Sequence, residues 1–505
     1  MTIELRPYQI TAVEQIEQAL CRDHGKVLLV APTGSGKTEI ASAIIKRWVE
    51  RHKTALFLAH RREIIQQTAA KLAANGIAHG AGHGIIMAGV EPRPFAPVQV
   101  ASIDTLHVRG VRSKAMALPP ADLLVFDEAH RARGRTREHL ISLYPGAALL
   151  GMTATPCRGD GRGLGNIFTT MIECPQVADL IVGGFLVKSR VYAPVSSDIA
   201  AGVRIEKGDY VISQLEGRMN TDALVGDIVE HWLKYGERRR TICFAVGVGH
   251  SVHIRNEFEQ FGVRVEHLDG ETSIAEREAI LGRLASGETE VVTNCMVLTE
   301  GWDLPAVSCC ILARPTKQMG LFRQMIGRVL RPADGKPDAV ILDHSGAVYR
   351  HGLPEDLVEW TLDVDKRAVN PVQAKRDRGE APKLHECPSC KAIMVKPPCS
   401  HCGWQPQLRA RAVDFEDGEL GLVVSGKANA SRYSEADRTS FFQQLRAVQQ
   451  MRGYKRGWAA HKFKDKFGHF PPWDYDRLPS VAPTDALLRW VRSRNIAYAK
   501  SRSAA

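Results

Sequence analysis

A chain of 505 residues is too long for one ordinary domain, so we expect three or four domains. Hydrophobic residues make up 44% and charged residues 24% of the chain, which excludes an intrinsically disordered or membrane-embedded protein. The net charge of +11 favours an acidic partner.

The N-terminus and the cysteines indicate the compartment. The first residues contain no apolar segment of signal-peptide length, and no apolar run approaches the roughly 18 residues of a spanning helix. Eleven cysteines, an odd number, favour reduced thiols over a disulfide framework. We therefore expect a cytoplasmic protein with no membrane contact.

Residues 1–190 alternate short apolar runs with longer segments of helical periodicity. The strand candidates are Val27–Val30, Ala55–Ala59, Leu123–Phe126 and Ala147–Leu150. This alternation predicts βαβ units around a buried parallel sheet. The fold class is thus α/β, and residues 1–190 form the first predicted domain.

A glycine-rich segment follows the first predicted strand and opens a predicted helix. It reads Ala31-Pro32-Thr33-Gly34-Ser35-Gly36-Lys37-Thr38. In this order the backbone N–H groups of the turn and the helix dipole face an anion. We expect Pro32 to Thr38 to bind ATP, with Lys37 at the β- and γ-phosphates and the Thr38 hydroxyl on Mg²⁺. Ala31 replaces the usual first glycine, but Gly34 and Gly36 give the turn its backbone freedom.

Two adjacent carboxylates follow a later apolar run. The run Leu123–Phe126 is followed by Asp127-Glu128-Ala129-His130. Ligands of open α/β sheets bind at the carboxyl ends of the strands, where this pair is expected to lie. We predict that Asp127 holds Mg²⁺ and that Glu128 orients and deprotonates the attacking water.

A second series of apolar runs indicates a second α/β domain. Its strand candidates are Thr241–Val246, Val263–Leu268, Glu290–Thr293, Ser308–Leu312 and Ala339–Leu342. We place a linker at 191–220, the second domain at 221–350 and a further linker at 351–383.

A basic segment in this second domain offers arginines to a phosphoryl group. It reads Gln324-Met325-Ile326-Gly327-Arg328-Val329-Leu330-Arg331-Pro332. On a continuous helix Gln324, Arg328 and Arg331 would lie on one face. There the arginines can stabilise charge on the transferring γ-phosphoryl group and close the cleft when ATP is bound.

Four cysteines with metal-ligand spacing occupy the segment 384–404. Cys387 and Cys390 form one CxxC pair, and Cys399 and Cys402 form another eight residues later. Two such pairs predict a structural Zn²⁺ site of four thiolates. Whether this module is a staple or a nucleic-acid contact stays open, and we expect zinc removal to perturb the C-terminal module more than ATP binding.

The predicted C-terminal domain, 405–505, is basic and aromatic-rich. Residues from Ser431 onward hold 15 of the 67 Lys and Arg and 12 of the 33 aromatic residues. Helices are expected after Ser434 and Thr484. Basic side chains beside rings suit nucleic-acid contacts, but Trp458, Phe463 and Phe467 equally fit a small helical core. A role in docking a protein partner also remains open.

The ordered set of motifs resembles superfamily 2 DEAD/DEAH-type helicases over about 330 residues, which implies two tandem RecA-like domains with parallel sheets. Leu5-Arg6-Pro7-Tyr8-Gln9 resembles the adenine-contacting entry motif, which implies Arg6 and Gln9 as base contacts. Met152-Thr153-Ala154-Thr155-Pro156 resembles the motif that couples hydrolysis to movement. Thr299-Glu300-Gly301-Trp302-Asp303 and the Gln324 segment resemble motifs V and VI, so Gly301 and Asp303 join the nucleotide site.

Two further motifs resemble the family's contacts to a nucleic-acid strand. They are Leu58-Ala59-His60-Arg61-Arg62-Glu63 and Ala101-Ser102-Ile103-Asp104-Thr105-Leu106. By this resemblance Arg61, Thr105 and Thr293 contact strand phosphates.

Together with the four-cysteine module, the motifs most resemble the bacterial and phage RadD-like branch. This implies an ATP-dependent DNA helicase or translocase, on single-stranded or branched DNA, in repair, recombination or phage replication. Three alternatives remain: an ATP-gated clamp that does not travel, the motor subunit of a restriction system, and an RNA helicase.

Overall fold

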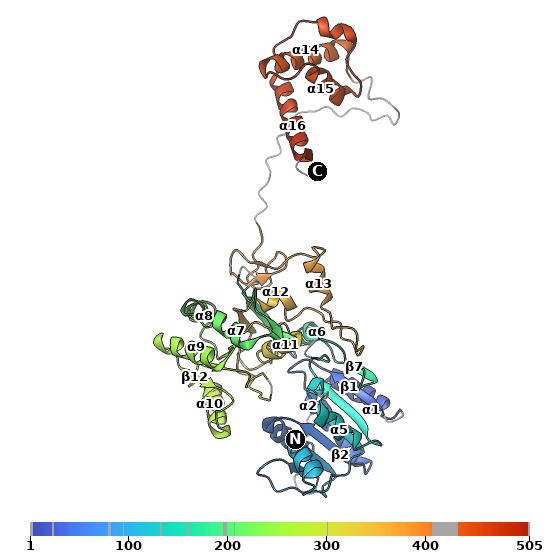
Figure 1. Cartoon of the computed structure of the whole chain (residues 1–505), viewed down its shortest axis with the longest axis vertical. Helices are drawn as coiled ribbons and strands as arrows, with labels where there is room; N and C mark the ends of the chain where they lie inside the picture. Colours follow the sequence, from blue (N-terminus) through green and yellow to red (C-terminus); the bar gives the residue numbers. More distant parts are fainter. Residues whose placement is uncertain are drawn as a thin grey trace. The chain divides into compact units, whose positions relative to one another are not determined.

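The computed structural model describes residues 4–22, 25–78, 82–93, 95–131, 134–158, 161–194, 199–206, 208–299, 301–406 and 433–502. Glu300 and the stretch 407–432 of the predicted C-terminal domain lie outside the described residues. The chain divides into two compact units, 1–407 and 408–505 (Figure 1). Among the helices described, none combines the length and the hydropathy needed to cross a bilayer.

The first sheet has seven parallel strands in the order β3-β4-β2-β5-β6-β1-β7. Its strands are β1 (Lys26–Val30), β2 (Ala55–Ala59), β3 (His83–Ile86), β4 (Val98–Ser102), β5 (Leu123–Asp127), β6 (Ala148–Thr153) and β7 (Thr170–Glu173). The helices around it are α1 (Pro7–Leu20), α2 (Lys37–Glu50), α3 (Arg62–Ala74), α4 (Ile103–Leu106) and α5 (Arg135–Ser142), with short helical turns η1 (His107–Arg112) and η2 (Ala129–Arg131).

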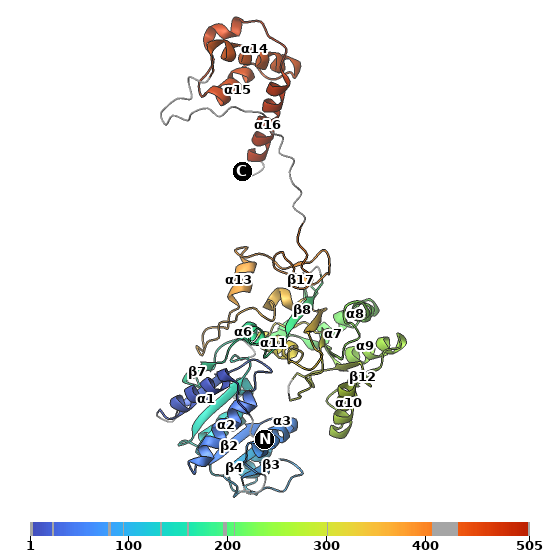
Figure 2. The ribbon, with the colours of Figure 1, turned by 180° about the vertical axis from the view of Figure 1, so that it is seen from behind.

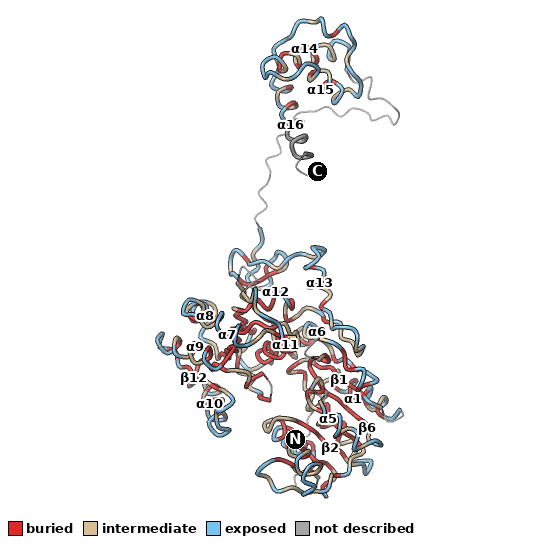
Figure 3. The backbone as a smooth tube through the Cα atoms, in the orientation of Figure 1, coloured by how far each residue is buried: buried red, intermediate tan, exposed pale blue. Residues whose placement is uncertain are grey.

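Alternate residues of each central strand enter two different cores. In β1, Val27 and Leu29 pack against α1, α2 and α3, while Leu28 and Val30 pack on the opposite face with α4 and α5. Because both faces are covered, the strand is apolar throughout. Figure 3 shows the buried strands inside and the exposed helix surfaces outside.

The second sheet has six parallel strands in the order β12-β13-β11-β14-β15-β8. Its strands are β8 (Lys188–Tyr192), β11 (Thr241–Phe244), β12 (Val265–Leu268), β13 (Val291–Asn294), β14 (Cys309–Leu312) and β15 (Asp338–Asp343). Its helices are α6 (Val177–Val182), α7 (Ile212–Met219), α8 (Asp222–Tyr235), α9 (Val248–Gln260), α10 (Ile274–Ser286), α11 (Met319–Gly327) and α12 (Ala347–His351). The predicted fold class, with two parallel α/β domains, is confirmed.

The segments that we assigned as linkers have structure of their own. Strand β8 begins before residue 191 and pairs with β15, so the second sheet starts within the predicted first domain. A hairpin of β9 (Ile205–Glu206) and β10 (Asp209–Tyr210) follows. Beyond α12, Trp360 and Leu362 pack on the core of the first domain before α13 (Pro371–Asp377). The segment 351–383 therefore returns to the first domain because its apolar side chains complete that core.

The remaining elements are two antiparallel strands and the helices of the second unit. Strands β16 (His385–Glu386) and β17 (Ile393–Met394) form the cysteine segment, which lies beside β8 (Figure 2). The second unit contains α14 (Glu435–Met451), α15 (Trp458–Phe467), η3 (Trp473–Arg477) and α16 (Asp485–Arg502). Helix α14 begins after Ser434, whose hydroxyl accepts from the Asp437 amide, as predicted.

Candidate functional site

A cleft of about 410 Å³ lies between the two α/β domains. The phosphate loop and the end of β5 supply one wall, and the segments that follow β13 and α11 supply another. The cleft is lined by Glu4, Arg6, Gln9, Pro32, Thr33, Gly34, Gly36, Lys37, Thr38, Glu39, Ile64, Gln67, Lys71, Asp127, Glu128, Gly301, Trp302, Asp303, Pro305, Arg328, Arg331 and Pro332. All predicted nucleotide-site residues except Ser35 and Gln324 are among them.

Two glycines give the phosphate loop its shape. Gly34 and Gly36 have φ values of +88° and +85°, which side chains disfavour. A Cβ atom on Gly34 would also lie 2.9 Å from Cγ of Arg331, which comes from the second domain. Helix α2 then begins at Lys37, so its N-terminus faces the cleft and favours an anion there.

The entry motif holds the phosphate loop from behind. The Gln9 side-chain amide and the Tyr8 hydroxyl both donate to the Ser35 carbonyl, at 2.9 and 2.7 Å. The Arg6 guanidinium lies over the Phe185 ring, 4.8 Å from its centroid. Gln9 thus positions the loop in this structure, and its contact with the adenine base stays a prediction. Phe185 was missed by sequence reasoning because it lies in no motif.

Glu128 is a buried carboxylate at the end of β5. Its Oε1 lies 3.9 Å from Nζ of Lys37, and its Oε2 lies 3.3 Å from Nδ1 of His130. Burial opposes ionisation, but the charge of Lys37, the hydrogen bond and charge of His130 and the charge of Arg328 hold the Glu128 pKa well below its ordinary value. The carboxyl is therefore ionised at neutral pH, as a base requires.

His130 links Glu128 to the Thr153 motif. The same Nδ1 atom lies 3.1 Å from the Thr153 hydroxyl, which also accepts from the Thr155 amide at 3.0 Å. Because β5 and β6 are neighbours in the sheet, the two motifs meet at one edge. The predicted coupling motif is thereby connected to the predicted base.

Replacing His130 with Ala should slow ATP hydrolysis by roughly 10- to 100-fold, because a hydrogen bond to a charged group contributes about 1.5–3 kcal/mol. His130→Gln, which retains a hydrogen-bonding side chain, should recover part of the loss. The measurement is steady-state kcat and KM for ATP, with exposed His139→Ala as the control. An unchanged kcat in His130→Ala would show that the link has no role in hydrolysis.

The basic motif differs from its prediction. Helix α11 ends at Gly327, so Gln324, Arg328 and Arg331 do not share one helical face. Gln324 lines a second cavity. Arg328 and Arg331 still reach the cleft because the chain turns at the end of the helix.

The two arginines have different partners. Arg328 is buried and donates to the carbonyls of Thr299 and Trp302, at 2.7 to 3.1 Å, so it holds the motif V loop. Arg331 pairs with Asp303, and burial lowers its pKa to about 10, which still leaves it charged at neutral pH. Their action on a γ-phosphoryl group stays a prediction.

The three residues predicted to contact a nucleic-acid strand differ in burial and in their partners. Arg61 donates across the domain boundary to the carbonyls of Val297, at 2.6 Å, and Met296, at 3.4 Å. Thr105 is half-buried at the start of α4. Thr293 is fully buried in β13, and its hydroxyl lies 3.4 Å from the His267 ring. The Thr293 side chain has no exposed surface in this structure, and its contact with a strand phosphate stays a prediction.

Sequence reasoning also missed an ion pair in the cleft. Nζ of Lys71 lies 2.6 Å from Glu39 Oε1. Glu39 directly follows the phosphate loop in the first turn of α2, and this position could have identified it as a residue of the cleft. No sequence motif indicates Lys71 as a cleft residue, because it lies on α3, far from the phosphate loop in the sequence.

The four cysteines converge as predicted. Their sulfur atoms all lie within 4.8 Å of one another, and the pairs Cys387–Cys402 and Cys390–Cys399 are 3.7 Å apart. A tetrahedral zinc with Zn–S bonds of about 2.3 Å needs sulfurs about 3.8 Å apart. The donor set and its spacing therefore fit a structural Zn²⁺ ion.

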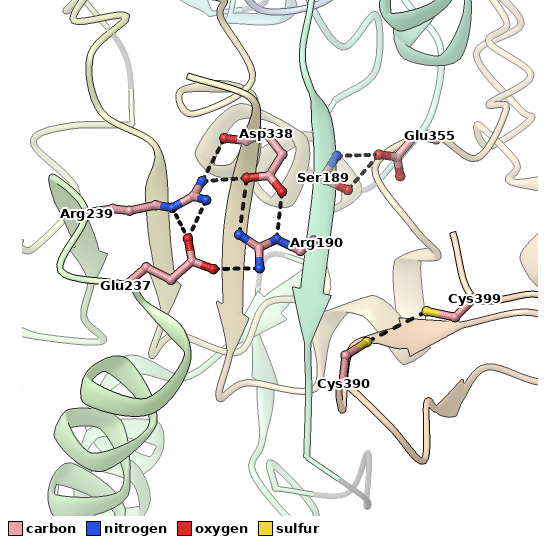
Figure 4. Close-up of polar contacts among 8 residues, drawn as sticks. All are labelled: Ser189, Arg190, Glu237, Arg239, Asp338, Glu355, Cys390 and Cys399. Atoms are coloured by element: carbon pink, nitrogen blue, oxygen red, sulfur yellow. Dashed lines mark hydrogen bonds and ion pairs between the residues drawn. The ribbon is translucent and has the colours of Figure 1, made fainter. Parts of the chain in front are cut away.

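The cysteine module is packed on the edge of the second sheet. Ile393 of β17 belongs to the same core as Val191 of β8. Figure 4 shows Cys390 and Cys399 beside β8, where Arg190 lies 2.7 Å from both Glu237 and Asp338. Hydrogen bonds from Arg190, and then from Arg239, hold the Glu237 pKa below its ordinary value. The module is thus attached to the second α/β domain.

The aromatic residues of the second unit mainly form a core. Phe463 is fully buried with Phe442 and Leu445, and Trp458 and Phe467 pack around them. Between the two interpretations of these rings, the structure favours the helical core. Trp473 differs, since it is 96% exposed.

Two family models match the chain. One, described as "Type III restriction enzyme, res subunit", matches residues 2–158, and the other, "Helicase conserved C-terminal domain", matches residues 224–333. Together they cover more than half of the 505 residues.

Three curated proteins illustrate the similarity. The "51.5 kDa protein" of Lactococcus phage (isolate 7-9) is 28% identical over 81% of this chain and 84% of its own length. A protein of Schizosaccharomyces pombe, provisionally assigned as the mitochondrial ATP-dependent helicase irc3, is 29% identical over 70% of this chain and 59% of its own length. "DNA 3'-5' translocase XPB2" of Sulfurisphaera tokodaii is 24% identical over 66% of this chain and 80% of its own length.

Two solved structures share the fold. A fragment of a provisionally assigned HsdR subunit of a type I restriction enzyme from Vibrio vulnificus YJ016 has a TM-score of 0.56 and 24% identity, over 69% of this chain and 66% of that one. The ATP-dependent Type ISP restriction-modification enzyme LlaBIII bound to DNA has a TM-score of 0.52 and 18% identity, over 67% of this chain and 28% of that one. At such identity these likenesses show the fold alone.

Proposed function

Because the chain belongs to the superfamily 2 DEAD/DEAH-type helicases, we propose that it is a DNA-stimulated ATPase that translocates on DNA or unwinds it. Membership of this family supports an ATP-hydrolysing helicase or translocase and implies ATP and usually Mg²⁺. DNA as the stimulating strand is our inference, and it draws on a relative named as a DNA translocase.

The observation that carries the proposal is the composition of the cleft. Lys37 and Glu128 come from the first domain, and Arg328 and Arg331 come from the second. Because both domains contribute residues to the site, bound ATP contacts all of them only when the domains are close together. ATP therefore favours the closed arrangement of the domains, and hydrolysis allows them to separate. This is the requirement for a motor.

We assign the residue roles as follows. Lys37 and the loop amides bind the phosphates, and Thr38 and Asp127 hold Mg²⁺. Glu128 takes the proton of the attacking water, and Arg331 faces the developing charge. Mg²⁺, when bound, neutralises phosphate charge.

The bridges between the domains connect the cleft to the strand motifs. Arg61 follows β2 and donates to the loop after β13, and Arg277 pairs with Glu63 at 3.0 Å. Both contacts join a predicted strand motif of the first domain to the second domain. Movement of the domains therefore alters the surface that we assign to the DNA strand.

The dependence of hydrolysis on strand length tests movement. A translocating enzyme should show a DNA-stimulated ATPase rate that rises along a series of oligo(dT) lengths before it reaches a plateau, because each binding event then supports more steps. A static ATP-gated clamp should give one rate once a single binding site is filled. A length-independent rate would therefore contradict translocation while leaving ATPase activity intact.

A motor subunit of a restriction system is the second candidate, favoured by the description of the family model that matches residues 2–158. The sequence resemblance to the RadD-like branch instead favours repair, recombination or phage replication. Co-purification with a nuclease or methyltransferase chain would support the restriction candidate.

A further inference from the structure

The second unit, which contains α14, α15 and α16 (Figure 1), carries its charges in separate places. No Asp or Glu occurs in the stretches 438–464 and 486–505, which hold 7 and 5 Lys and Arg residues. Two of the carboxylates outside these stretches are engaged locally: Asp437 bonds to Ser434 at the start of α14, and Asp465 lies 2.9 Å from Lys462. Parts of the unit are therefore basic without offsetting acidic residues.

The turn between α14 and α15 presents three of these cations. Arg452, Lys455 and Arg456 are exposed, and none of them pairs with a carboxylate among the residues that the structure describes. Arg452 follows the C-terminus of α14, where the helix dipole favours a cation. Lys455 and Arg456 precede the N-terminus of α15, where the dipole disfavours a cation. The stability of the helices therefore does not explain these two residues.

Helix α16 brings a further arginine to the same side of the unit. The Asn495 side-chain amide donates to the Tyr454 hydroxyl at 3.4 Å, so this part of α16 lies against the turn. Arg492 lies three residues before Asn495, on the same side of the helix, and is exposed. Two segments that are distant in the sequence thus form one surface. We call it the basic face, and it consists of Arg452, Lys455, Arg456 and Arg492.

The turn has a fixed shape. The Tyr454 amide donates to the Gln449 carbonyl at 3.0 Å, and the Gln449 side chain accepts from the Ala459 amide at 3.0 Å. The Tyr454 and Trp458 rings pack together with their centroids 4.5 Å apart. Both rings are half-buried, so they support the turn and do not offer an open face to a base. The exposed cations are therefore positioned before a ligand binds, which lowers the entropic cost of binding.

The charge of the basic face indicates the kind of partner. Four neighbouring cations repel one another, and a polyanion relieves that repulsion. Sites for a single strand combine such charge with rings on which bases stack, whereas the rings beside this face pack on each other. Contacts to phosphates alone are typical of sequence-independent binding to a duplex.

We propose that the basic face binds the phosphate backbone of duplex DNA. The proposal rests on the proposed DNA-dependent function and adds a duplex contact outside the two α/β domains. Lys455 and Arg456 supply the central contacts, because the turn exposes both of them, and Arg492 supplies a contact from α16.

The test is equilibrium binding of a short fluorescein-labelled duplex to the full chain by anisotropy, at several salt concentrations. The double variant Lys455→Gln/Arg456→Gln should weaken duplex binding by about 10-fold, and each lost phosphate contact should reduce the steepness of log K against log salt by about 0.9. Arg492→Gln should weaken binding by a smaller factor. It tests the face from a second segment if the double variant does not fold, which thermal unfolding reveals.

Arg477→Gln is the matched control. It removes the same charge from an exposed position of the same unit, but Arg477 lies in η3 beside Asp474 and Asp476. Its affinity for the duplex and its salt slope should equal those of the wild type. Oligo(dT) of matched length should lose less affinity than the duplex in the double variant.

The outcomes separate this proposal from the function on which it rests. If the wild type binds neither the duplex nor oligo(dT), the proposed function fails and the basic face fails with it. If the wild type binds the duplex and the variants keep its affinity and salt slope, the basic face alone is overturned. Weaker binding of oligo(dT) with duplex binding intact would overturn the duplex assignment. Binding of polyglutamate that is lost in the double variant, with duplex binding intact, would show an acidic protein partner and overturn it as well.

Discussion

Replacing Glu128 with Gln is expected to lower kcat for ATP hydrolysis by roughly 10²- to 10⁴-fold, the usual contribution of a general base. The amide keeps the shape of the side chain but cannot accept the proton of the attacking water. Nucleotide affinity should be retained, because the carboxylate lies 3.9 Å from Lys37 and competes with phosphate for that cation. Steady-state turnover and binding of a fluorescent ATP analogue measure the two effects separately.

The control for Glu128→Gln is Glu50→Gln, the same change at the exposed end of α2. It should leave kcat at the wild-type value. Turnover by Glu128→Gln above about a tenth of wild type would contradict the assignment of the base. Loss of nucleotide binding in the same variant would instead indicate that Glu128 organises the phosphate loop.

Removal of zinc is expected to destabilise the second α/β domain, lowering its Tm by roughly 10 °C, in the range for loss of a structural metal. Cys387 and Cys399 are buried, and Ile393 between them packs into the core of that domain. Without the metal the module cannot hold Ile393 in place. Thermal unfolding of chelated protein and of Cys399→Ser, with metal content from mass spectrometry, measures the effect.

Cys21→Ser is the matched control for the zinc experiment, since Cys21 is an exposed thiol in the first domain. It should keep both the metal and the Tm. An unchanged Tm after complete chelation would contradict the structural role of the module. From the sequence we expected zinc removal to perturb the C-terminal module more than ATP binding. Because Ile393 shares a core with Val191, we now expect the second α/β domain to be destabilised as well.

Most of the central strands were predictable because both of their faces are buried. Ala55–Ala59 coincides with β2, and the runs at Leu123 and Ser308 fall within a residue of β5 and β14. Four strands of the two parallel sheets were missed: β3, β4, β7 and β8. The edge strands β7 and β8 are only partly buried and carry polar residues, and the internal strand β4 is interrupted by Gln99 and ends in Ser102. Short edge strands lack the continuous apolar run that identifies a central strand.

The parts of the site whose functional residues lie close together in the sequence were predictable. The phosphate loop, the acidic pair and the cysteine module are local patterns, and the structure brings each of them together. The orientation of Gln324 was not predictable, because it depends on where α11 ends.

The most direct test of the account is the ATPase activity of the purified chain with no nucleic acid, single-stranded DNA, forked duplex DNA and RNA of matched length. Lys37→Ala, which lacks the phosphate-binding ammonium, gives the blank. We expect weak basal turnover that DNA raises more strongly than RNA, and no turnover in the blank. Stimulation by RNA alone, or the same rate with and without nucleic acid, would contradict a DNA-driven motor.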